Sequence, residues 1–155
     1  MSADTRGPTT PTAMRLDQQV CFAIGVAHRA VQAVYRPLLD PLGITHPQFL
    51  VMLTLWDSSP RSVREIATEL HMDVGTLSPL LRRLEAAGFV TRTRSLRDER
   101  ALDIAVTPAG RKLRLRALRV PEAVNASLGL SQNDFDELYA LLERFTVAAR
   151  TSTGR

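Results

Sequence analysis

Residues 62–106 read SVREIATELHMDVGTLSPLLRRLEAAGFVTRTRSLRDERALDIAV, and this stretch decides the fold. Two short helical patterns are separated by a tight turn at residues 71–73, after which the apolar period changes from about 3.6 to about 2. Ser62 and Glu65 form a predicted capping box that opens the first helix, and Gly88 is the predicted stop of the second. The stretch therefore predicts a helix-turn-helix followed directly by a β-hairpin.

The second of these helices has two predicted starts, and the hairpin follows it. Asp73 and Thr76 both carry side chains that cap helix N-termini. Pro79 has no N–H and fits best within a first turn, which favours Thr76 or a locally irregular start. Beyond the helix, residues 89–94 alternate, residues 95–100 form a polar tip, and the return strand alternates through Leu102, Ile104 and Val106. A hairpin in this position is a wing.

Helical patterns flank this region on both sides. Before it, apolar residues repeat at spacings of three and four from about residue 17 to residue 36, and Pro37 is predicted to end that helix. The run Thr45-His46-Pro47-Gln48 is a second predicted capping box, which opens a very apolar core helix. After the hairpin, Thr107-Pro108 opens an arginine-rich helix. Ser131 starts the last helix, whose apolar stripe is Phe135, Leu138, Leu142, Phe145 and Ala149.

The chain has the length of one domain, with 155 residues of which 45% are hydrophobic. We expect a flexible N-terminal arm at residues 1–15 and a single domain at residues 16–150. Within it, the winged helix-turn-helix spans about 47–107, and dimerisation helices span about 16–43 and 108–150. The winged core has its own apolar cover, so the stripes at both ends need a partner. The predicted fold class is mainly α with a two-stranded β-wing, dimerising through its N- and C-terminal helices.

Several classes of protein are excluded by composition. No apolar run approaches the roughly 18 to 20 residues of a membrane span, and no charged-then-apolar signal segment opens the chain. The sequence has one cysteine, so neither an intramolecular disulfide nor a cysteine-based zinc site can form. The three histidines lack metal-ligand spacing. We therefore expect a cytoplasmic protein with no metal, no cofactor and no membrane partner.

Basic residues are concentrated in one part of the chain. Residues 82–119 contain eleven Arg or Lys and four Asp or Glu, so this stretch carries +7 while the whole chain carries +4. Charge alone fits a polyanion partner and a solvated charged face equally. The order of elements favours DNA, because a basic wing follows a helix-turn-helix.

The docking geometry of a winged helix-turn-helix assigns roles to particular residues. The N-terminal residues of a recognition helix lie near base edges in the major groove, while the wing reaches phosphates or the minor groove. Thr76 and Ser78 are therefore candidates for base or phosphate hydrogen bonds, and Arg82 and Arg83 suit phosphates. For any single arginine the alternative is a solvated surface charge. One winged helix covers a small patch, so we expect a homodimer on a pseudo-palindromic operator.

Three stretches of the sequence resemble one known family. They are LDQQVCFAIGVAHRAVQAVYRPLLDPLGITHPQFLVMLTLW, HMDVGTLSPLLRRLEAAGFVTRTRS and RDERALDIAVTPAG. They are similar to the organic hydroperoxide regulators, the OhrR-type, one-cysteine branch of the MarR family, over roughly residues 16–145. The resemblance implies a repressor that binds double-stranded DNA and is not an enzyme. It also implies that Arg100 reads the minor groove, oriented by Asp98, and that the DNA backbone is contacted by Arg92, Arg94 and Arg97.

Cys21 has two interpretations. A lone cysteine on a helix is most often a small buried apolar residue, although a position near the helix start favours the thiolate. The resemblance places Cys21 at the family's peroxide-sensing position and Tyr35 at one of the tyrosines that hold the thiol. The family's second tyrosine falls on His46, which can still donate a hydrogen bond. Cys21 and Tyr35 lie about 21 Å apart along one helix, so their contact requires antiparallel first helices from two subunits.

The resemblance also implies a reaction. The Cys21 thiolate attacks an organic hydroperoxide to form a sulfenate, which then forms a mixed disulfide with a low-molecular-weight thiol or oxidises further, and the operator is released. The alternative is a MarR-type repressor that a small aromatic ligand releases, with Cys21 structural. A third hypothesis, a thiol peroxidase with an incidental basic surface, is disfavoured by the complete winged motif.

Overall fold

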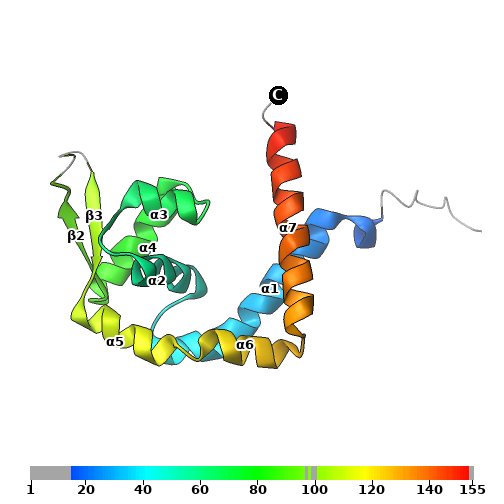
Figure 1. Cartoon of the computed structure of the whole chain (residues 1–155), viewed down its shortest axis with the longest axis horizontal. Coiled ribbons are helices and arrows are strands. Elements are labelled where there is room, and N and C mark those ends of the chain that lie inside the picture. Colours follow the sequence, from blue (N-terminus) through cyan, green and yellow to red (C-terminus); the bar gives the residue numbers. More distant parts are fainter. Residues whose placement is uncertain (1–14, 97, 99–100, 154–155) are drawn as a thin grey trace, which may run out of the picture. The chain divides into compact units, whose positions relative to one another are not determined.

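The structure, a computed structural model, describes residues 15–96, 98 and 101–153. The chain divides into two compact units, Met1–Ala117 and Leu118–Arg155. The first unit (Figure 1) contains, in chain order, the 3-10 helix η2 (Leu16–Gln18), α1 (Val20–Leu39), the 3-10 helix η3 (Asp40–Leu42), α2 (His46–Asp57), β1 (Arg61–Ser62), α3 (Val63–Glu69), α4 (Val74–Ala86), β2 (Val90–Arg94), β3 (Leu102–Val106) and α5 (Pro108–Ala117). The second unit contains α6 (Val120–Leu128) and α7 (Gln132–Thr153).

Both predicted capping boxes of the helix-turn-helix region are confirmed. Thr45 N–H donates to Gln48 Oε1 at 2.8 Å, and Gln48 N–H donates back to Thr45 Oγ1 at 3.5 Å, which starts α2. Ser62 N–H donates to Glu65 Oε2 at 2.7 Å, and Glu65 N–H donates to Ser62 Oγ at 3.2 Å, which starts α3. These bonds satisfy donors that the first turn of a helix leaves unpaired.

Of the two predicted starts of α4, Asp73 is confirmed and Thr76, which Pro79 favoured, is wrong; the predicted end of α1 at Pro37 is also wrong. Helix α4 starts with Asp73 as its N-cap, because Asp73 Oδ1 accepts from Thr76 N–H at 2.8 Å, and Pro79 lies inside the helix. Helix α1 likewise continues through Pro37 to Leu39, which is buried. A proline removes one helix hydrogen bond, and here the aspartate cap and the buried leucine outweigh that loss.

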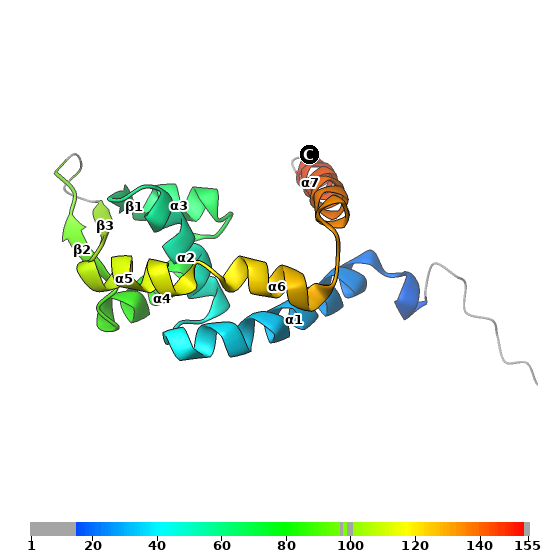
Figure 2. The same ribbon diagram turned by 60° about the horizontal axis from the view of Figure 1, so that its bottom comes forward.

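The predicted wing is present, and the sheet contains one strand more than predicted. β2 and β3 pair antiparallel from Val90↔Val106 to Arg94↔Leu102. β1 pairs with the other side of β3, so the strand order is β1-β3-β2 (Figure 2). A strand of two residues has no alternation for the sequence to reveal.

A glycine and a threonine hold the base of the wing. Gly88 has φ 78°, and the bonds from Gly88 N–H to Glu85 O and from Phe89 N–H to Leu84 O end α4 as predicted. Thr107 Oγ1 donates to Gly88 O at 2.6 Å and accepts from Gly110 N–H at 3.0 Å. The start of α5 is thereby attached to the end of α4.

The first unit has a continuous apolar core beneath the sheet. Fully buried side chains come from α2, α3, α4, β2, β3 and α5, and they include Phe49, Ile66, Leu77, Leu84, Val90, Ile104 and Leu113. In the second unit Ser131 directly precedes α7, and its N–H donates to Asp134 Oδ2 at 2.7 Å. Helix α7 has no buried residue. Among the described residues, no helix combines the length and the apolarity that crossing a membrane requires.

Candidate functional site

One face of α4 is buried and the other is exposed. Leu77, Leu81 and Leu84 pack into the core at helical spacing. The opposite face presents Thr76, Arg82 and Arg83 to solvent, and Ser78 is half-buried. The structure therefore places the predicted DNA-contacting residues of this helix on its exposed side or at its margin.

The two hydroxyl groups at the start of α4 already donate within the helix. Thr76 Oγ1 donates to Asp73 Oδ2 at 2.7 Å, and Ser78 Oγ donates to Val74 O at 2.7 Å. The hydrogen bonds from Thr76 hold the pKa of the Asp73 carboxyl below its usual value, so the cap stays charged. The protons of both hydroxyls are thus engaged within the helix, and each oxygen keeps acceptor capacity in this conformation.

The arginines of the wing differ in their surroundings. Arg94 is exposed at the end of β2. Arg92 is bonded to Glu85 of α4, with Nε 2.7 Å and Nη2 2.6 Å from Glu85 Oε2. Asp98 O accepts from Ala101 N–H at 2.9 Å in the turn between the strands. The predicted wing residues Arg97 and Arg100 lie outside the described residues.

Cys21 lies in the first turn of α1 and is exposed. Its neighbours on the same half of the helix include Val20, Phe22, Ile24 and Val26, each at least 38% exposed. The exposure of the thiol contradicts the interpretation of Cys21 as a buried apolar residue within one chain. An exposed apolar helix half is typical of a surface that another chain covers.

Tyr35 and His46 are brought together by the packing of α1 against α2. Their ring centroids are 4.5 Å apart, and Phe49 lies 6.2 Å from Tyr35 on the inner side. Burial raises the pKa of Tyr35, and burial together with the nearby His28 lowers the pKa of His46. Near neutral pH, therefore, the phenol keeps its proton and the imidazole is neutral, so both groups can donate a hydrogen bond without carrying charge.

Two side-chain contacts near these positions were not predicted from the sequence. Gln32 Nε2 donates to His28 Nε2 at 3.0 Å, an i, i+4 pair on α1 that spacing alone can suggest. Glu85 binds Arg92 across two elements, for which a single sequence carries no signal. Within the described ranges, no group of three or more His, Cys, Asp or Glu residues is placed to bind a metal ion.

Comparison with known proteins identifies the family. The MarR family model matches residues 44–102. The organic hydroperoxide resistance transcriptional regulator of Bacillus subtilis (strain 168) is 39% identical over 137 residues, which cover 84% of this chain and 91% of that protein. The solved structure of reduced AbfR bound to DNA is similar, with a TM-score of 0.75 and 35% identity over 89% of this chain and 94% of that one. AbfR of Staphylococcus epidermidis is also among the similar solved structures. Overoxidized AbfR bound to DNA is similar with a TM-score of 0.68 and 36% identity over 87% and 99%. The chain therefore belongs to the MarR family and is a DNA-binding transcriptional regulator.

Proposed function

We propose that this chain is a homodimeric repressor that senses organic hydroperoxides through Cys21 and then releases its operator. The observation that carries the proposal is an exposed thiol on an exposed apolar helix, in a chain 39% identical to an organic hydroperoxide resistance regulator. The similarity to AbfR, solved in reduced and overoxidized states, supports oxidation chemistry. The repressor acts in the cytoplasm, where its operator lies.

The sensor in this proposal is completed across the dimer. Cys21 and Tyr35 lie fourteen positions apart on α1, about 21 Å along the helix, so one chain cannot join them. When two α1 helices run antiparallel, Tyr35 and His46 of the partner subunit approach Cys21. Their neutral donors then stabilise the thiolate by hydrogen bonds.

The reaction conserves atoms and electrons. The Cys21 thiolate attacks the terminal oxygen of the hydroperoxide, the O–O bond breaks, and the alkoxide leaves and takes up a proton to become an alcohol. The sulfenic acid formed is attacked by a low-molecular-weight thiol, which gives a mixed disulfide and water. The cysteine is consumed once per event, so the chain acts as a sensor and not as an enzyme.

In this proposal, added bulk releases the DNA. The overoxidized AbfR structure contains DNA, so added oxygen atoms alone are compatible with binding in that relative. A mixed disulfide adds a larger group beside Tyr35 at the dimer interface and biases the dimer away from its DNA-bound form.

In this proposal the recognition helix and the wing bind the operator. Thr76 and Ser78 contact bases or phosphates, and Arg82, Arg83, Arg94 and Arg97 contact phosphates. Arg100 enters the minor groove, with Asp98 orienting it. The two wings of a dimer engage the two halves of a pseudo-palindrome.

The test is a mobility-shift assay with the gene's own upstream region. Cumene hydroperoxide with a small thiol is expected to release the wild-type protein, whereas Cys21→Ser stays bound at the same oxidant concentration. Ala33→Ser, on an exposed position of the same helix, is the control and responds as wild type. Release of Cys21→Ser by the oxidant contradicts the proposal. Release by an aromatic acid without oxidant supports the ligand-responsive alternative.

A further inference from the structure

The sheet carries an arginine on each of its two edge strands. Arg61 of β1 and Arg92 of β2 both pair with Ile104 of the central strand β3. Residues that pair directly across antiparallel strands point to the same face of the sheet. Ile104 is 0% exposed, so the row Arg61–Ile104–Arg92 lies on the face that covers the core.

Each arginine of this row binds a carboxylate on one helix of the helix-turn-helix. Arg61 forms an ion pair with Glu69, the last residue of α3. Arg92 binds Glu85, near the end of α4, through two nitrogens at 2.7 and 2.6 Å. The side chains of Arg92 and Glu85 are 28% and 36% exposed, so water screens this pair incompletely. Both helices of the motif are thus attached to the sheet, each through a different edge strand.

The direction of the Arg92 side chain conflicts with a phosphate contact. A guanidinium with two nitrogens on one carboxylate is compensated in charge and oriented toward α4. Arg94, two residues further along β2, is exposed and meets no such carboxylate among the described contacts. The two arginines therefore have different roles on the same strand.

We propose that Glu85, acting through Arg92, is a positioning residue that sets the angle of the wing relative to the recognition helix. With that angle established before binding, the helix and the wing meet the duplex together, and less ordering remains to be done on association. Arg92 then contributes no phosphate contact. The inference rests on DNA binding by the chain and is independent of the redox proposal.

The first test asks whether Glu85→Gln strengthens or weakens DNA binding. Glu85→Gln removes a negative charge from a DNA-binding region, so electrostatics alone predicts tighter binding. The positioning role predicts weaker binding, by about threefold to tenfold, measured by fluorescence anisotropy of the reduced protein on its own upstream region. Glu69→Gln, which loosens the other edge of the same sheet, is the matched control and changes the affinity less than twofold. Binding by Glu85→Gln that equals or exceeds wild type overturns the proposal.

The second test counts phosphate contacts. Each lost contact lowers the slope of log K against log salt by about 0.9, hence by about 1.8 in a dimer. Arg92→Ala is expected to weaken binding with an unchanged slope, whereas Arg94→Ala lowers the slope. An equal loss of slope in both variants identifies Arg92 as a phosphate contact and overturns the proposal. The charge-swapped double variant Glu85→Arg/Arg92→Glu is expected to recover affinity to within about threefold of wild type.

A measurement without DNA separates this inference from the proposed function. Amide hydrogen exchange of residues 90–94 is expected to be several-fold faster in Glu85→Gln than in wild type or Glu69→Gln. Unchanged exchange in β2 contradicts the positioning role even when the wild type binds DNA. Failure of the wild type to bind any fragment of its upstream region contradicts the proposed function. In that case the exchange rates of residues 90–94 still test whether Glu85 positions the wing.

Discussion

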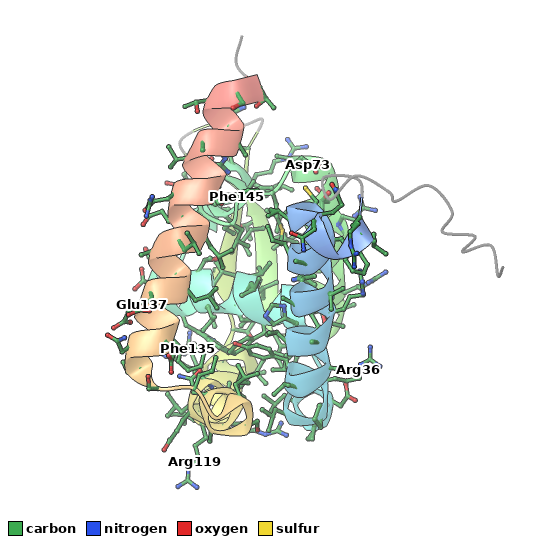
Figure 3. All side chains as sticks on the ribbon, turned by 90° about the vertical axis from the view of Figure 1, so that its right-hand side faces the viewer. Arg36, Asp73, Arg119, Phe135, Glu137 and Phe145 are labelled. Carbon is green, nitrogen blue, oxygen red and sulfur yellow. The ribbon has the colours of Figure 1, made fainter. Side chains whose placement is uncertain are left out.

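Apolar side chains form a buried core in the winged region and stay at least partly exposed in helix α7. In the winged region Phe49, Ile66 and Leu84 are almost completely buried, and all three belong to the first compact unit, Met1–Ala117. In α7 the apolar residues recur at helical spacing, yet none is buried, and Leu142 and Phe145 are 41% and 42% exposed. Figure 3 labels Phe135 near the start of α7 and Phe145 further along the same helix. The contrast shows that the winged region is stabilised by its own core, whereas the α7 stripe has no buried residue. That a second subunit covers this stripe stays a prediction.

The largest effect is expected when charge is placed in the α7 stripe, which tests whether this stripe forms the dimer interface. Leu142→Asp combined with Phe145→Asp is expected to raise the dimer dissociation constant by at least about a hundredfold, because unpaired carboxylates would have to be buried at the interface. Sedimentation velocity over a concentration series measures this effect. Glu143→Gln, an exposed change in the same turn, leaves the constant within about twofold. A charged double variant that remains dimeric at wild-type concentrations shows that α7 is not the interface.

The comparison is sharpened by equal truncations in the two regions. Leu84→Ala leaves a cavity in the core of the winged region and is expected to lower the free energy of unfolding by about 2 to 5 kcal/mol. Leu141→Ala, at a position 59% exposed in α7, is expected to cost less than about 1 kcal/mol. Urea denaturation followed by circular dichroism, at one fixed protein concentration, measures both. Equal losses would mean that Leu141 is buried as deeply as Leu84.

The smallest effect concerns the half-buried contact between α1 and α2. Because the pKa of His46 is lowered in the folded state, the unfolded chain binds more protons below a pH of about 6.5. Stability is therefore expected to fall as the pH drops from about 6.5 through the lowered pKa, and to be unaffected by His46 above that window. Thermal unfolding between pH 5 and pH 8 measures the slope.

Two variants test whether His46 causes this pH dependence of stability. His46→Gln is expected to reduce the pH dependence, since glutamine does not titrate. His71→Asn is the control, with asparagine chosen because the φ of 53° at this position is left-handed. A slope that His71→Asn removes and His46→Gln preserves would locate the titration elsewhere.

Local signals in the sequence predicted much of the fold. The capping boxes at Thr45 and Ser62, the stop at Gly88 and the alternation of the wing all depend on neighbours within a few residues, and the structure confirms them. The proline predictions failed because a single local penalty was weighed without the aspartate cap of α4 and the buried Leu39 of α1. Thr76, Arg82 and Arg83, which the sequence predicted to contact DNA, are exposed on α4.

The sequence by itself determined the order of elements, the basic character of residues 82–119 and the presence of a single thiol, since each follows from residue type and short spacing. The tertiary structure decided that β1 joins the sheet, that Tyr35 meets His46, and that Arg92 binds Glu85. These pairings depend on the angles at which separate elements pack. Those angles arise from the filling of the whole core, so no short stretch of residues encodes them.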